Sequence, residues 1–177
     1  DELRELCGTL RRLHPRSLVS VDCHYDLGWL AVERGDEAEA KAAYSVVAAH
    51  EDPRNARAAA ELARLAGDRS TARADAIARA SAADAEWWAR LPAADAYATA
   101  AAIHGSSAEG QQALRAARAI LGEALGYRNA THIRRRYIRA TALLALATRD
   151  RTLAAEALAW YRAVGGYDVM IAELAAI

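Results

Sequence analysis

The dipeptide Gly35-Asp36 is the strongest structural signal in this chain, because it places a helix stop directly before a helix start. Glycine readily adopts the left-handed conformation that ends many helices, and aspartate is a preferred cap for the next one. The flanking residues predict helices over 18–34 and 36–51. The spacing of a helix-turn-helix unit is carried by Leu27, Gly28, Gly35, Asp36, Glu39, Ala40, Tyr44 and Pro53.

The composition extends this helical character to the whole chain. The sequence of 177 residues holds 48 alanines, no phenylalanine and only three prolines, so helix formers dominate and helix breakers are few. This favours the all-α class, and the length suits a single domain, 1–177, with a sizeable core. Charged or polar residues interrupt every apolar segment before the roughly 20 residues that a membrane-spanning helix needs, so we expect no membrane partner.

Proline and glycine divide the rest of the chain into further helices. Apolar residues recur at helical spacing before Pro15, which predicts a first helix that caps the stack. Proline suits the first position of a helix, so Asp52-Pro53 is expected to begin one. Arg149-Asp150 stands at the Gly-Asp position of a fourth helix pair. The helices expected beyond the central pair cover residues 3–14, 53–66, 68–91, 92–104, 108–125, 129–148, 150–164 and 168–176.

On these residues the chain resembles the tetratricopeptide repeat family. The Gly-Asp turn recurs after 32 residues at Gly67-Asp68, and the resemblance covers 23–53 and 54–84. Beyond residue 84 it is architectural only, and other two-helix repeats or an irregular helical bundle stay open. The resemblance implies an α-α superhelix of about four helix pairs plus capping helices. It assigns repeat packing, through small residues and an aromatic, to Leu27, Gly28, Gly35, Asp36, Ala40, Tyr44, Gly67, Asp68 and Ala72.

The resemblance also implies a concave groove, lined by the first helix of each pair, that suits a peptide or a partner protein. Tyr25 and Trp29 lie four residues apart, a spacing that equally suits a helical core. The arginines around Glu61 equally suit a solvated face of paired charges. The groove positions implied are Asp22, Tyr25, Asp26, Trp29, Arg54, Arg57, Glu61, Arg64, Asp95, Thr99, Arg136 and Arg139.

The charge pattern argues against a dedicated nucleic-acid binder, because the formal net charge is zero. Residues 1–88 carry 16 acids against 12 bases, and residues 89–177 carry 7 against 11. The basic cluster from Ile133 to Arg139 invites a nucleic-acid hypothesis, but its arginines point in several directions on a helix. We therefore expect nucleic acid to be an unlikely partner.

Catalytic and metal-binding patterns are also missing from the sequence. Asp22, Cys23, His24 and Asp26 are rich in ligand atoms, yet neighbours on a helix diverge by about 100°, so only the two aspartates share a face. No paired histidines or cysteines have metal-ligand spacing. We expect no metal, no cofactor and no enzymatic activity.

The two cysteines and the Trp87-Trp88 pair can each be interpreted structurally. Cys7 and Cys23 lie outside any disulfide-rich framework, so we expect reduced, buried thiols in a cytoplasmic protein. For Trp87-Trp88, we expect both rings to be buried against the following helix, the alternative being one exposed ring at an interface. An arginine-rich, lysine-poor composition suggests a bacterial source, and the start at Asp1 suggests a piece of a longer protein.

These observations predict a protein-interaction scaffold or regulatory domain that binds a peptide or partner protein in a groove. The first alternative is the ligand-sensing or peptide-sensing carboxy-terminal domain of a bacterial transcription regulator or kinase. The second alternative is a nucleic-acid-binding helical repeat. The repeat pattern alone does not choose among them, because the pattern encodes packing and not the binding surface.

Overall fold

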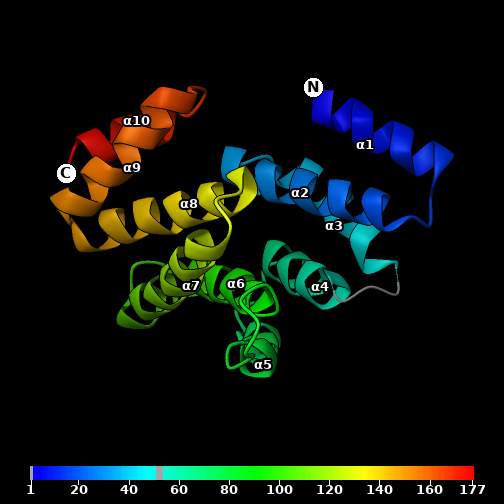
Figure 1. Ribbon diagram of the computed structural model, residues 1–177, viewed down its shortest axis with the longest axis horizontal. Helices are drawn as coiled ribbons and strands as arrows, with labels where there is room; N and C mark the ends of the chain where they lie inside the picture. The colour runs from blue at the N-terminus through cyan, green and yellow to red at the C-terminus, as the bar shows by residue number, and fades with distance from the viewer. Residues whose placement is uncertain (1, 51–53) are drawn as a thin grey trace. The chain divides into compact units, whose positions relative to one another are not determined.

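The computed structural model describes residues 2–50 and 54–177, and in these residues the chain is all-helical, with ten helices and no strand (Figure 1). None of these helices is both long and apolar enough to cross a bilayer. The chain forms two compact units, residues 1–73 and 74–177, which are described separately.

The first unit contains four helices, coloured blue to cyan in Figure 1. They are α1 (Glu2–Leu13), α2 (Leu18–Arg34), α3 (Glu37–Ala48) and α4 (Arg54–Leu65). Each helix packs on the next along the chain, and α2 with α3 forms the central hairpin. The starts and ends of α1 and α2 agree with the sequence prediction, whereas the predicted end at Glu51 and start at Asp52-Pro53 lie outside the described residues.

The turn between α2 and α3 forms as the sequence predicts. Gly35 has φ 74°, and its N–H donates to carbonyls of the last turn of α2, which satisfies groups that would otherwise lack a partner. The Asp36 side chain accepts a hydrogen bond of 3.0 Å from the Glu39 N–H at the start of α3. Both predicted capping roles are therefore confirmed.

The hairpin packs through a small residue against an aromatic ring. Ala40 and Tyr44 on α3 are 0% and 1% exposed. A Cβ atom added to Gly28 would lie 2.9 Å from the Tyr44 ring, closer than side chains tolerate. Glycine at this position therefore allows the close approach of α2 and α3 that the resemblance implies.

A disulfide joins Cys7 of α1 to Cys23 of α2. The prediction of reduced thiols was therefore wrong. The two cysteines lie on different helices, and helical periodicity alone does not predict that α1 packs on α2. Once α1 packs along α2, the two Cα atoms lie 5.4 Å apart, within the range that a disulfide requires.

The second unit begins within α5 (Ala72–Ser81) and continues through five more helices, coloured green to red in Figure 1. Helices α6 and α7 form one hairpin, and α8 and α9 form another, with α10 packed on both α8 and α9. Leu174 of α10 is buried among side chains of α8 and α9, so the final helix closes this end of the core. The bounds are α6 Leu91–His104, α7 Ala108–Tyr127, α8 Thr131–Thr148, α9 Arg151–Val164 and α10 Asp168–Ala175.

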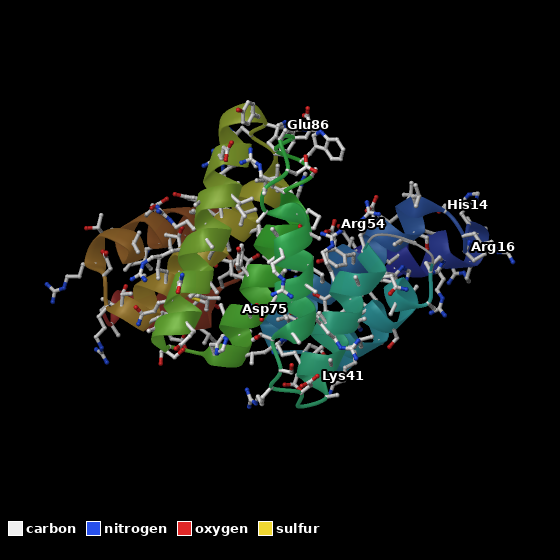
Figure 2. All side chains as sticks on the ribbon, turned by 90° about the horizontal axis from the view of Figure 1, so that it is seen from below. His14, Arg16, Lys41, Arg54, Asp75 and Glu86 are labelled. Carbon is white, nitrogen blue, oxygen red and sulfur yellow. A yellow bond between two sulfur atoms is a disulfide. The ribbon has the colours of Figure 1, made fainter. Side chains whose placement is uncertain are left out.

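The main departure from the sequence prediction is the long helix expected over 68–91, because only α5 forms there. Before α5, Asp68 accepts a hydrogen bond of 2.8 Å from the Ser70 N–H in a local turn. After it, Asp84 accepts one of 2.9 Å from the Glu86 N–H; Glu86 is labelled in Figure 2. Such local bonds compete with helix formation. Ala72, expected to pack between helices, is instead an exposed residue in the first turn of α5.

Candidate binding site

Helices α2 and α4 bring four predicted groove residues together in the first unit. Asp22 and Arg54 form an ion pair with a nitrogen–oxygen distance of 2.5 Å, and Arg54 is labelled in Figure 2. The Arg57 guanidinium lies 4.7 Å from the centre of the Tyr25 ring, which is a cation–π contact. Two predicted groove residues of α2 therefore contact two of α4, which is the first helix of the next predicted repeat.

Tyr25 lies beneath this surface. Its ring is 4% exposed and meets the Tyr44 ring edge to face, with 5.9 Å between centroids. The burial favours the core interpretation of Tyr25, with Arg57 above it. Asp26 is exposed and Trp29 is half-buried on the same helix, so these two remain accessible groove candidates.

Glu61 and Arg64 pair with each other on α4. The Arg64 Nε and Nη2 atoms donate hydrogen bonds of 3.0 and 2.9 Å to one carboxylate oxygen of Glu61. Pairing along one helix holds both side chains in a fixed orientation. It also satisfies their charges, so a partner would have to exchange these bonds for its own. The two side chains are only 18% and 13% exposed, which does not fit the solvated-face alternative.

The groove residues predicted in the second unit lie inside its packing. Asp95 of α6 and Arg136 of α8 form an ion pair of 3.4 Å, and their side chains are only 6% and 11% exposed. Thr99 is 6% exposed and donates a hydrogen bond of 3.1 Å to the Asp95 carbonyl. Arg139 is half-buried on α8. The Asp95–Arg136 pair thus connects α6 to α8, and these buried residues together with Thr99 do not present an accessible groove.

The arginine cluster of α8 spreads around the helix, as the sequence analysis expects. Arg134 donates a hydrogen bond of 2.9 Å to the Asn129 side chain, whereas Arg136 points to Asp95. A continuous basic surface for a nucleic-acid backbone would need these side chains on one face.

Trp88 contradicts the expectation that both tryptophans are buried, because it is 59% exposed. Trp87 is half-buried and stacks on Tyr127, with 6.3 Å between ring centroids. The segment between α5 and α6 is a series of turns, so its consecutive side chains diverge and only one ring reaches the helices.

A pocket that the sequence analysis missed lies between α1, α2 and α3. Its volume is about 470 Å³, within the range of about 300–1,000 Å³ that small-molecule sites occupy. Arg4, Gly8 and Arg11 recur along one face of α1. This spacing predicts that the three residues share a surface, but it does not predict which helix packs against that surface. The pocket is lined by Arg4, Gly8, Arg11, His24, Leu27, Asp36, Ala38, Glu39, Ala42, Ala43 and Val46.

The polar side chains of this pocket differ in the hydrogen bonds that they already make within the protein. Arg4 donates a short hydrogen bond to Glu39, and this bond raises the pKa of the guanidinium above its usual value. His24 is 6% exposed, and its Nδ1 lies 2.8 Å from the Ser20 carbonyl oxygen. A carbonyl can only accept, so Nδ1 donates this hydrogen bond, and Nε2 is an acceptor in the tautomer that carries its proton on Nδ1.

No cluster of three or more histidine, cysteine or acidic side chains among the described residues could hold a metal ion. The comparisons with known proteins found no matching family model, curated protein or solved structure. The residues of α2, α4 and the pocket are therefore the basis for the function proposed below.

Proposed function

We propose that this chain is a protein-interaction module of the tetratricopeptide-like class, an α-α superhelix of about four helix pairs that binds a peptide or partner protein. The contacts between α2 and α4, namely the Asp22–Arg54 ion pair and the Arg57–Tyr25 contact, carry the proposal. Stacked repeats form an extended binding surface, and these contacts join the first helices of two predicted repeats.

The α2–α4 face, meaning Asp22, Asp26, Trp29, Arg54, Arg57, Glu61 and Arg64, combines an aromatic ring with charges of both signs. Half-buried Trp29 offers a large contact area, and aromatic side chains with arginine are enriched at interface hot spots. Arginine can grip a carboxylate of a partner in a bidentate manner. An extended peptide or a helix with alternating charges fits this surface best.

The experiment is a capture assay followed by affinity measurement with the purified partner. Asp26→Lys and Trp29→Ala change exposed or half-buried side chains of the α2–α4 face. We expect each to weaken partner binding at least tenfold while the far-UV circular dichroism and melting temperature stay close to those of the native chain. Glu37→Lys reverses an exposed charge on α3 and is the matched control, which should bind normally.

The proposal would be wrong if Glu37→Lys weakened binding as much as Asp26→Lys, since the effect would then reflect net charge and not this face. It would also be wrong if Trp29→Ala unfolded the first unit, because Trp29 would then be a core residue. Neither result depends on the identity of the partner.

A ligand-sensing role is the second candidate, and the pocket between α1, α2 and α3 favours it. The Cys7–Cys23 disulfide bears on where either role is performed. Structural disulfides persist in oxidising compartments and are rare in the cytosol. The cytoplasmic location expected from the sequence would require these two cysteines to be reduced, so the disulfide argues for an oxidising compartment instead.

A further inference from the structure

The pocket between α1, α2 and α3 contains one cation that no carboxylate of the described residues neutralises. Arg4 is paired with Glu39, and Asp36 accepts the Glu39 N–H at the positive end of α3. Arg11 is exposed at the pocket and has no charged partner among the described residues. The lining therefore has a single uncommitted positive charge.

The pocket also contains a hydrogen-bond acceptor, His24 Nε2, and an apolar wall. The His24 Nε2 atom has no hydrogen-bond partner among the residues that the structure describes, although its ring is 6% exposed and lines the pocket. Leu27 of α2 and Ala42 and Val46 of α3 supply apolar surface. A ligand would satisfy all three features only if it carried an anion, a donor and an apolar body.

Gly8 keeps the α1 side of the pocket open. A Cβ atom added to Gly8 would meet no atom within 4 Å, even though the residue lines the pocket. Glycine inside a helix costs roughly 0.5–1 kcal/mol relative to alanine. The space beside Gly8 is therefore available to a ligand without any movement of α1.

We propose that this pocket binds a small organic monocarboxylic acid that carries a hydroxyl or N–H donor. The carboxylate pairs with Arg11, the donor reaches His24 Nε2, and the apolar body lies against α2 and α3. A monoanion fits better than a phosphate, because the acidic groups of Asp36 and Glu39 also line the pocket. The site shares no residue with the α2–α4 face, so it is independent of the proposed partner-binding function.

The first test compares three probes by isothermal titration calorimetry on the full 177-residue chain. The probes are 4-hydroxyphenylacetate, phenylacetate, which lacks the hydroxyl, and tyramine, which replaces the carboxylate by an ammonium group. We expect the hydroxy acid to bind, phenylacetate to bind about fivefold more weakly because one hydrogen bond is lost, and tyramine not to bind. Tyramine binding as tightly as the acid, or no binding of the hydroxy acid at millimolar concentration, would overturn the proposal.

The second test fills the pocket. Gly8→Leu places a side chain in the open space and should abolish binding of 4-hydroxyphenylacetate without unfolding the chain. Gly126→Leu is the matched control, since Gly126 is also helical with nothing within 4 Å, and it lies in the second unit. Binding that survives Gly8→Leu, or that Gly126→Leu also removes, would contradict the pocket assignment.

The third test removes the charge. Arg11→Gln should weaken 4-hydroxyphenylacetate about tenfold, the loss typical of a charge-assisted hydrogen bond. An unchanged affinity would show that Arg11 does not hold the carboxylate. Asp26→Lys, which tests the partner-binding face, should leave acid binding unchanged, and Gly8→Leu should leave partner capture unchanged, so the two proposals fail separately.

Discussion

The hairpins α2–α3 in the first unit and α8–α9 in the second follow one plan with different residues. Each turns at a left-handed residue followed by a capping aspartate, but the residue is Gly35 with φ 74° in the first and Arg149 with φ 55° in the second. Arginine accepts this conformation at a steric cost that glycine avoids. In these two hairpins, a capping aspartate follows the left-handed residue whether or not that residue is glycine.

The small residues around the two turns correspond in the same way. Seven residues before the left-handed position stand Gly28 and Ala142, both buried. Eight residues after the capping aspartate stand Tyr44 and Leu158, each in the same core cluster as its hairpin. In the first unit the larger side chain, Tyr44, accompanies the smaller residue, Gly28. In the second unit the smaller side chain, Leu158, accompanies the larger residue, Ala142, and both combinations suit close packing.

The units differ most in the ion pair that joins the first helices of consecutive predicted repeats. In the first unit the side chains of Arg54 and Asp22 are 27% and 49% exposed, whereas those of Arg136 and Asp95 in the second are 11% and 6% exposed. Surface pairs contribute about 0–1 kcal/mol. Removing one partner of a buried pair costs about 3–5 kcal/mol. The same chemistry should therefore matter far more in the second unit.

The largest expected effect tests that difference. Asp95→Ala should destabilise the second unit by about 4 kcal/mol, whereas Asp22→Ala should cost less than about 1 kcal/mol in the first. Denaturant unfolding and hydrogen exchange of each unit give both values. Replacing both partners, with Asp95→Leu and Arg136→Met, should recover most of the loss because no charge is then left buried. Equal costs for the two aspartate variants would contradict the role assigned to burial.

Reduction of the disulfide should produce the next largest effect, confined to the first unit. Cys7 and Cys23 are 16 residues apart, and closing a loop of that length stabilises a protein by about 3 kcal/mol. A reductant should therefore accelerate hydrogen exchange in α1 and α2. Exchange in α8 and α9 is the internal control, because the chain has no cysteine after Cys23. Unchanged exchange in α1 would show that helix packing alone holds it.

Gly28→Leu should cost about 2–3 kcal/mol, because its side chain must displace the Tyr44 ring. The melting temperature measures the loss. Gly28→Ala combined with Tyr44→Leu places at these positions the residue types of Ala142 and Leu158 in the other hairpin, and it should be more stable than Gly28→Ala alone. An unchanged melting temperature for Gly28→Leu would refute the packing of α2 against α3 at this residue.

The smallest effect concerns the turns. Gly35→Arg should destabilise the first hairpin by about 1 kcal/mol, and Arg149→Gly should stabilise the second by no more than that, because only glycine adopts the left-handed region freely. Chemical denaturation of the two variants, each compared with the native chain, checks the signs. Two effects of the same sign would mean that contacts of the Arg149 side chain outweigh its backbone conformation.

Helices and turns whose causes are local can be predicted from the amino-acid sequence. Gly35, Asp36 and Asp150 act through the backbone within a few residues, so their spacing sufficed to place the helix ends. The same local reasoning failed over 68–91, where Asp68 and Asp84 hold turns by their own side-chain bonds. The helix ends at Gly35, Asp36 and Asp150 and the turns at Asp68 and Asp84 all depend on interactions between near neighbours. Only the prediction for the turns at Asp68 and Asp84 was wrong.

Only the tertiary structure decided which distant residues meet. The Cys7–Cys23 disulfide, the burial of Asp95 against Arg136 and the pocket beside Gly8 all depend on how one helix lies on another. Periodicity shows which residues share a face of a helix but not what packs against that face. The neighbouring sequence of Cys7 does not distinguish it from a free cysteine, that of Asp95 does not distinguish it from a surface charge, and that of Gly8 does not distinguish it from a solvated glycine. Only the packing of one helix on another makes these distinctions.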